Sequence, residues 1–302
     1  MARVLATGTD FLRPRRSFHV FADKEVGEMS ENAKERVRQV VREQYGNVAR
    51  GTSSSCAPGC CGVSPTASLA LGYSEEDLAA VPDGANLGLG CGNPQALASL
   101  RAGETVLDLG AGAGFDCFLA AKQVGASGRV IGVDMTPDMV SKARANAEHL
   151  GDQRVEFRLG EIEHLPVQDS SVDVILSNCV INLSPDKAAV FREAFRVLRP
   201  GGRLAISDVV LMSELPPVLA RDVAALTGCV AGAAPVSELT RMLTQAGFVG
   251  VRVDVNPASR EFIRDWMPGS GVEEYVASAS IQASKPGAAD CCEPSCCGGS
   301  TA

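Results

Sequence analysis

The chain has 302 residues, of which 45% are hydrophobic, and it carries a formal net charge of −8 at pH 7. Nucleic acids need a concentrated basic face, and the one basic cluster, Arg13–Arg16, is short, so we expect no nucleic-acid partner. No stretch reaches the roughly 18 apolar residues of a membrane helix, and the first residues lack the apolar run of a secretory signal, so we expect a cytoplasmic protein without a membrane partner.

The first 70 residues are expected to form an N-terminal region with one helix and one cysteine-rich loop. Residues 24–50 have a helical composition with valines spaced to share a face, and this helix is expected to end near Gly46. The loop after it, GTSSSCAPGCCGVSP, is rich in residues that break regular structure. Ser74 is placed to begin a further helix, and a glycine-rich loop surrounds Cys91.

From Glu104 onward, apolar strands alternate with helices. Strands are expected at Thr105–Leu109, Arg129–Asp134, Val155–Leu159, Val172–Ser177, Gly202–Asp208, Val249–Val255 and Tyr275–Ser284. Helices are expected at Phe115–Val124, Pro137–Leu150, Pro185–Leu198 and Val236–Ala246. This alternation predicts an α/β fold with a doubly wound, mostly parallel sheet. We assign it to a core of residues 71–285 with a small helical insert at about 214–235, followed by a cysteine-rich tail, residues 286–302, that is expected to be disordered.

A glycine-rich turn, DLGAGAG, follows the first strand of this core. Gly110, Gly112 and Gly114 let the backbone approach a ligand, and Asp134, at the end of the next strand, can accept hydrogen bonds from both hydroxyls of a ribose. This arrangement leaves NAD, FAD and S-adenosylmethionine open. The G-A-G-A-G spacing and Asp108, an acid suited to a ligand with a sulfonium and an ammonium group, favour S-adenosylmethionine. The alternative is a tight turn without a ligand.

The 11 cysteines need an explanation, because the cytoplasm keeps thiols reduced and disfavours structural disulfides. Cys179 directly follows the strand Val172–Ser177, at the end of a parallel strand, where ligands bind in α/β sheets. A thiol at this point indicates chemistry on a soft, sulfur-seeking substrate. The strand position alone is equally compatible with a small core residue.

The ordered set VLDLGAGAG, VIGVDMTPDM, GEIEHLP and LRPGGRL resembles the class I S-adenosylmethionine-dependent methyltransferases. The resemblance implies that Asp134 holds the ribose, that Met135 packs on the adenine, and that the glycine turn takes the methionine portion. It also implies that Ile162 and Glu163 line or hydrogen-bond the adenine edge, and that Asn178 lies beside the transferable methyl group. For Glu163, a solvated loop acid is the alternative.

A narrower resemblance rests on GLGCGNP, GAGFDCFLAA, SNCVINLSPDK and SDVVL, with Cys229 further along the chain. From about residue 45 to residue 285, the chain is similar to the arsenite S-adenosylmethionine methyltransferase family. The resemblance implies that Cys179 and Cys229 bind As(III), that Cys91 supplies a third thiolate, and that one cysteine of the Cys60-Cys61 pair joins Cys91 in a redox step. Adjacent cysteines cannot be told apart by position, and we favour Cys61. The implied activity methylates arsenite and then methylarsenite, with a cytoplasmic thiol reductant such as glutathione or thioredoxin as partner.

The chemistry of arsenic supports this interpretation independently. Trivalent arsenic prefers thiolates, and three of them leave a pyramidal centre with an exposed lone pair, which can attack the sulfonium methyl without a general base. Methylation formally oxidises arsenic, so a nearby dithiol that becomes a disulfide, and is then reduced again, would return arsenic to the trivalent state.

Several cysteines keep other interpretations. Cys117 lies in an apolar helix and is expected in the core. Cys56, Cys60 and Cys61 could form a zinc site with Cys91, although they lack paired C-x₂-C spacing. The four tail cysteines could capture arsenite, bind a metal or have no role.

Two other functions are compatible with the sequence, and one residue differs from the family pattern. The chain could methylate a small organic acceptor such as a quinone or sterol, which would need an apolar pocket without converging thiols. It could also be a non-catalytic thiol protein that sequesters metalloids. Some relatives carry an aromatic residue where Leu89 stands here, so the number of methyl groups added is left open.

Overall fold

The computed structural model describes residues 29–52 and 67–287. The predicted cysteine loop with Cys56, Cys60 and Cys61, and the tail with its four cysteines, lie outside the described residues.

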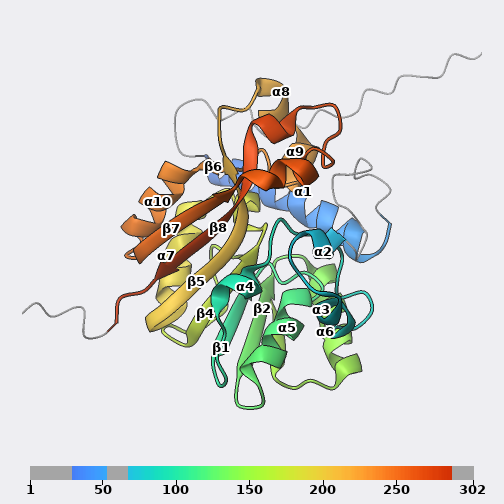
Figure 1. Cartoon of the computed structure of the whole chain (residues 1–302), viewed down its shortest axis with the longest axis vertical. Helices are drawn as coiled ribbons and strands as arrows, with labels where there is room; N and C mark the ends of the chain where they lie inside the picture. Colours follow the sequence, from blue (N-terminus) through green and yellow to red (C-terminus); the bar gives the residue numbers. More distant parts are fainter. Residues whose placement is uncertain (1–28, 53–66, 288–302) are drawn as a thin grey trace, which may run out of the picture.

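One sheet of eight strands forms the centre of the molecule, in the order β3-β2-β1-β4-β5-β8-β7, with β6 paired to β5 (Figure 1). The strands are β1 (Thr105–Leu109), β2 (Arg129–Asp134), β3 (Val155–Leu159), β4 (Val172–Asn178), β5 (Leu198–Leu211), β6 (Ala234–Pro235), β7 (Val249–Asn256) and β8 (Val276–Ser284). Within the described part of the chain, β8 alone runs antiparallel to its neighbours, β5 and β7. The predicted mostly parallel sheet is therefore confirmed.

The helices cover both faces of the sheet, as a doubly wound fold requires (Figure 1). The longer ones are α1 (Glu31–Ala49), α5 (Phe115–Val124), α6 (Pro137–Leu150), α7 (Lys187–Val197) and α10 (Val236–Gln245). The strand β1 shows how the two layers form, because Val106 packs with α5 and α6, whereas Leu107 and Leu109 pack with α7 and α10. Both sides of a central parallel strand are thus apolar, which explains why the adjacent residues Val106 and Leu107 are both hydrophobic.

Short helices build the loops near the carboxyl ends of the strands. They are α2 (Ala67–Ala70), α3 (Glu75–Ala79), α4 (Pro94–Ala98), η1 (Ile181–Leu183), α8 (Pro217–Ala220), α9 (Val223–Thr227), η2 (Pro257–Ser259), α11 (Arg260–Ile263) and η3 (Val272–Glu274). Ser74 caps α3 through a reciprocal pair of hydrogen bonds with Asp77, which confirms the predicted helix start. The helices α8 and α9 form the predicted insert, and Cys229 follows α9.

The helix α1 continues to Ala49, so the prediction that it ends near Gly46 is wrong. Gly46 is buried where α1 crosses α6, and a Cβ atom there would lie 3.0 Å from a carboxylate oxygen of Asp138. The glycine therefore permits close packing of two helices rather than ending one of them.

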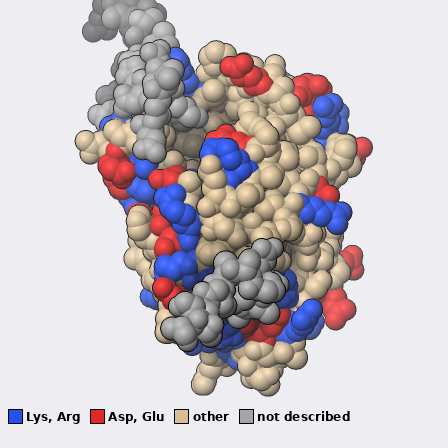
Figure 2. All heavy atoms as spheres, turned by 90° about the vertical axis from the view of Figure 1, so that its left-hand side faces the viewer, with Lys and Arg blue, Asp and Glu red and all other residues tan. Residues whose placement is uncertain are grey.

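On the face drawn in Figure 2, acidic and basic side chains lie interspersed around a broad uncharged area. Among the described residues, no helix combines the length and the apolar character that crossing a membrane would require.

Candidate active site

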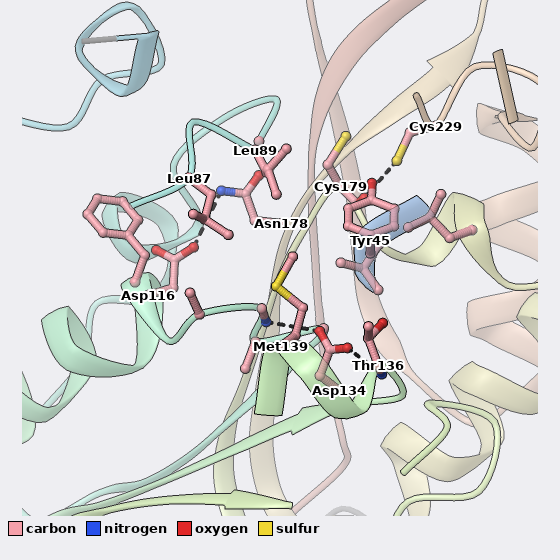
Figure 3. A pocket seen from close by; sticks show the side chains of 18 of the residues that line it. Tyr45, Leu87, Leu89, Asp116, Asp134, Thr136, Met139, Asn178, Cys179 and Cys229 are labelled. Atoms are coloured by element: carbon pink, nitrogen blue, oxygen red, sulfur yellow. Dashed lines mark hydrogen bonds between the residues drawn. The ribbon is translucent and has the colours of Figure 1, made fainter. Parts of the chain in front are cut away.

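A pocket opens at the carboxyl ends of β1, β2 and β4, and α1, α9 and the segment 85–90 contribute to its walls (Figure 3). It is lined by the glycine turn, by the end of β2 and by two of the predicted cysteines, Cys179 and Cys229. This is the edge of a parallel sheet at which ligands bind, because the loops after the strands converge there.

The glycines of the turn have different roles. Gly110 and Gly112 line the pocket with φ of 71° and 52°, a region that favours glycine. A Cβ atom at Gly112 would meet nothing within 4 Å, so the backbone is open to a ligand there. Gly114 is not part of the pocket wall, and a Cβ atom on it would lie 2.7 Å from the ring of Phe157. Gly114 thus allows close packing against Phe157, and its role in ligand approach stays a prediction.

Asp134 stands at the end of β2 with its carboxylate already oriented (Figure 3). One oxygen accepts a hydrogen bond from the Gly112 amide at 3.0 Å, and the other accepts one from the Thr136 amide at 2.8 Å. Burial raises the pKa of Asp134, although both amides oppose the shift. Each oxygen keeps a further lone pair, so the carboxylate can still accept two hydroxyls. Met135 and Ile162 line the pocket beside it.

Glu163 also lines the pocket and is only 4% exposed, so the alternative of a solvated loop acid is wrong. It accepts a hydrogen bond from Ser184 Oγ at 2.7 Å, and Arg38 Nε of α1 lies 3.6 Å from it. Arg38 also pairs with Glu161 at 3.3 Å. These ion pairs fasten α1 to the loop after β3, and the helix thereby covers one side of the pocket.

Three predicted cysteines from distant segments converge at the other end of the pocket, where Cys179 and Cys229 line the wall and Cys91 is buried next to Cys179. The Cys91 and Cys179 sulfurs and a carboxylate oxygen of Asp208 all lie within 4.8 Å of one another. The Cys229 thiol donates a hydrogen bond of 2.7 Å to the carbonyl of Cys179. Cys91 and Cys229 are buried, and Cys179 is partly exposed toward the pocket. We call Cys91, Cys179 and Cys229 the thiol cluster.

The backbone around the thiol cluster is tightly specified. Cys179 and Cys229 both have left-handed backbone conformations, with φ of 59° and 63°, which residues other than glycine seldom adopt. The Cys179 amide donates to the carbonyl of Ser207 at 2.8 Å, which ties the end of β4 to β5. The Cys91 carbonyl accepts a hydrogen bond of 2.6 Å from Ser278 Oγ of β8. Hydrogen bonds from β5 and β8 therefore hold Cys179 and Cys91 in place.

The thiols of the cluster are neutral at pH 7. Burial raises the pKa of Cys91 to about 11. The contact with Cys179, together with burial, raises the pKa of Cys229. Cys229 lowers the pKa of Cys179, but Cys91 and burial outweigh it, so this pKa is raised as well. Burial raises the pKa of Asp208 to about 6, so this carboxyl is largely ionised at pH 7.

Asn178 joins the two ends of the pocket. Its Oδ1 accepts a hydrogen bond from the Cys91 amide at 3.1 Å, and its Nδ2 donates to the Gly92 carbonyl at 2.9 Å. The same Nδ2 lies 3.4 Å from the carboxylate of Asp116, which stands in the first turn of α5, directly after the glycine turn (Figure 3). The predicted residue beside the methyl group is thus a structural link between the turn and the thiol cluster.

Other predicted residues are placed more simply. Cys117 is fully buried in the core, as expected, and its thiol donates to Asp108 at 3.3 Å. Leu89 lines the pocket (Figure 3). Cys61 lies outside the described residues, so its partnership with Cys91 stays a prediction.

Four residues of the site have no place in the sequence-based assignment. Three of them stand inside the motifs that carry the family resemblance: Asp116 in GAGFDCFLAA, Asn182 in SNCVINL and Asp208 in SDVVL. A polar residue within each of these largely apolar motifs was the available signal. Asn182 donates to Asp208 at 2.9 Å and to the Cys229 carbonyl at 3.2 Å, and in this way it holds the insert against β5. Tyr73 has no sequence signal, and only the structure brings it to the pocket.

A glycine turn after β1 and a carboxylate at the end of β2, in a sheet of order β3-β2-β1-β4-β5-β8-β7 with an antiparallel β8, are the arrangement of the class I S-adenosylmethionine-dependent methyltransferases. A family model described as a methyltransferase domain matches residues 100–247. A solved geranyl diphosphate methyltransferase with 21% identity and a TM-score of 0.54 covers 64% of this chain and 82% of its own, and it shares the fold.

The relatives narrow the class. An arsenite methyltransferase of Halobacterium salinarum is 53% identical over 263 residues, which make up 83% of this chain and 67% of that protein. One from Aquipseudomonas alcaligenes is 39% identical over 72% of this chain and 63% of its own length. The crystal structure of an arsenic(III) S-adenosylmethionine methyltransferase from Chlamydomonas reinhardtii is 36% identical, covers 74% of both chains and has a TM-score of 0.55. The chain belongs to the arsenite methyltransferase family, and it spans about two thirds of the length of these curated relatives.

Proposed function

We propose that the protein transfers methyl groups from S-adenosylmethionine to trivalent arsenic, first in arsenite and then in methylarsenite. The observation that carries the proposal is the convergence of Cys91, Cys179 and Cys229 at one end of a pocket whose other end holds the glycine turn and Asp134. The activities of the relatives named above support the same reaction.

The residues at the glycine turn fit the methyl donor. S-adenosylmethionine supplies, when bound, an electrophilic methyl group on a sulfonium. Asp134 is oriented to accept both ribose hydroxyls, while Met135 and Ile162 offer apolar surface for the adenine. Glu163 is a buried acceptor suited to the amino group of the adenine, and Asn178 would lie beside the methyl group.

The thiol cluster fits arsenite without a general base. Arsenite is neutral, and each exchange of an arsenic hydroxyl for a thiol forms one S–As bond and releases one water that carries away the thiol proton. Neutral, buried thiols are therefore the correct starting state. Arsenic held by Cys91, Cys179 and Cys229 keeps its lone pair, which forms the As–C bond while the carbon–sulfur bond of the donor breaks.

Each transfer leaves arsenic formally oxidised by two electrons. We propose that the sulfur of Cys61 attacks the arsenic-bound sulfur of Cys91, so that the disulfide forms, the As–S bond breaks with its electron pair returning to arsenic, and the Cys61 proton passes to water. A thiol reductant such as glutathione or thioredoxin then reduces the disulfide. That requirement places the reaction in the cytoplasm, where thiols are kept reduced, and the activity would serve arsenic detoxification.

The test is an assay of arsenic species by liquid chromatography and mass spectrometry, after incubation with donor, arsenite and glutathione. We expect monomethylated and dimethylated arsenic together with S-adenosylhomocysteine. Donor consumption that requires a quinone or sterol, with no methylated arsenic, would identify the protein as a methyltransferase of organic acceptors. Arsenite binding without donor binding in calorimetry would identify a sequestering protein.

A further inference from the structure

The strand β7 forms one edge of the sheet and is separated from β4 and the pocket by β5 and β8 (Figure 1). Within residues 29–52 and 67–287, β7 pairs with β8 alone. An edge strand presents a row of unpaired amide and carbonyl groups, which can pair with a strand of another molecule. The outer side of β7 is therefore a surface that a further strand can join.

The two faces of β7 carry different side chains. Val251, Val253 and Val255 pack against the hydrophobic core on the face covered by α10. Arg252 and Asp254 lie on the opposite face, because successive side chains of a strand alternate. Their side chains are 69% and 48% exposed. The strand thus combines an apolar face with a charged, solvated one.

The order of these residues is self-complementary. If a second β7 runs antiparallel to the first with the two-fold axis at Val253, Arg252 of each copy lies opposite Asp254 of the other. Val251 then lies opposite Val255, and the two Val253 residues face each other. Directly opposed side chains share a face, with Cβ atoms about 4.5–5.5 Å apart, close enough for ion pairs and contacts between valines. An axis at Arg252 or at Asp254 would oppose like charges, so the axis at Val253 is favoured.

The other edge of the sheet, β3, does not offer the same surface. Its Glu156 and Arg158 also have opposite charges, but both are engaged within the chain. Glu156 pairs with Arg129 of β2, and Arg158 pairs with Glu156 at 2.8 Å and donates to the Pro166 carbonyl at 2.7 Å. In the described part of the chain, the two charged residues of β7 pair only with each other, at 2.6 Å. They can therefore exchange partners with a second copy at little cost.

We propose that β7 is a self-association surface, which pairs antiparallel with β7 of a second copy of this chain and joins the two sheets into one. Charged side chains also protect sheet edges from pairing, but charges of one sign do so by repelling a second copy, whereas this alternating pair attracts it. The inference does not depend on the proposed function. The antiparallel arrangement places the two pockets at opposite ends of the joined sheet, because β7 runs parallel to β4.

Sedimentation velocity of the full chain at several concentrations tests the inference, with a thiol reductant present so that the 11 cysteines do not crosslink it. The wild-type chain should dimerise with a dissociation constant of about 1–100 µM, because two paired strands bury less area than a standard interface. Arg252→Asp and Asp254→Arg should each weaken the dimer by about 10-fold or more, because like charges then oppose each other at two symmetric positions. The double variant should return to within about 3-fold of wild type, because its reversed pairs are complementary again.

A matched control is Arg221→Asp, which makes the same change of charge at an exposed arginine of the insert and should leave the dimer unchanged. Thermal unfolding shows whether each variant is folded. A wild-type chain that stays monomeric up to about 0.5 mM would overturn the inference. A dimer that survives the single reversals would overturn it too, because its interface must then lie elsewhere. A monomeric double variant would exclude this register, and if one single reversal fails to fold, the other single reversal and the double variant decide the question.

Discussion

The two ends of the pocket are built in different ways. The end with the glycine turn, which we propose to bind the donor and call the donor end, uses a continuous stretch of chain from Asp108 to Glu163, in which each strand is followed by its own loop. The end with the thiol cluster, which we propose to bind arsenic and call the acceptor end, gathers its thiols from a loop before β1, from the end of β4 and from the insert after β5. The donor end is therefore a product of local chain geometry, whereas the acceptor end exists only when distant segments have packed.

This difference makes the two ends separable by substitution, although Asn178 connects them. Changes in the thiol cluster should remove acceptor chemistry and leave the donor site intact. Changes at the glycine turn or at β2 should do the reverse. Four experiments sharpen or break that distinction.

The largest effect is expected for Cys179→Ser and Cys229→Ser. Each should lower methylation of both arsenite and methylarsenite by more than about 100-fold, because a hydroxyl is a hard, protonated ligand that does not replace a thiolate on As(III). Serine keeps the size and the left-handed backbone of each site, so the fold and donor affinity should persist. Turnover near the wild-type rate in either variant would show that the thiol cluster is not the acceptor site.

A selective effect is expected for Cys91→Ser. Methylarsenite has two exchangeable ligands and can bind to Cys179 and Cys229 alone, so the first methylation should fall by more than about 10-fold and the second much less. Single-turnover assays on the two substrates measure the ratio. Equal loss on both would favour a packing role for Cys91, which contacts the core through Ser278. The same asymmetry is predicted for Cys61→Ser.

At the donor end, Asp134→Ala should weaken S-adenosylmethionine by about 10-fold to 100-fold, because hydrogen bonds to an ionised acceptor contribute about 1.5–3 kcal/mol. Arsenite affinity should be unchanged, as measured by quenching of Trp266 or by calorimetry. Loss of arsenite binding in this variant would mean that the two ends are not independent.

The last prediction concerns stability rather than activity or binding. The pKa of Asp208 is raised by burial from 3.8 to about 6, so the folded protein holds a proton in this interval that the unfolded chain has released. The stabilisation is complete below about pH 4 and is lost as the pH rises through about 6, a change of about 3 kcal/mol. Asp208→Asn removes this titration, so the stability of the variant relative to wild type should increase between pH 4 and pH 7. Urea unfolding of arsenic-free protein at both pH values measures it, and a parallel pH dependence in both proteins would refute the assignment.

The donor end could be predicted largely from the sequence. The bounds of β1, β2, β3, α5 and α6 agree with the expected ranges, because apolar periodicity and glycine punctuation act over short distances. Asp134 and Gly112 therefore stand where the pattern placed them. The packing of Gly114 against Phe157 was not predicted, since it depends on contact between a helix and a neighbouring strand.

The acceptor end could be predicted only through family resemblance. Spacing along the chain does not show that the loop with Cys91 folds back onto β4 and β5, or that a carboxylate, Asp208, joins the thiols. Tyr73 and Arg38 likewise reach the pocket through tertiary contacts that no local pattern encodes. The end of α1 was mispredicted for the same reason, because Gly46 makes room for Asp138 of α6 and does not end its own helix.

The burial of the thiol cluster also affects the competition with zinc inside a cell. A divalent cation binds thiolates and must displace a proton from each thiol, so the raised pKa of Cys91, about 11, weakens zinc binding at neutral pH. Arsenite brings no net charge, and the proton of each thiol leaves with the water that is formed, so the raised pKa does not oppose its binding. Under the proposed function, burial would therefore disfavour a divalent cation and leave the cysteines available to neutral arsenite.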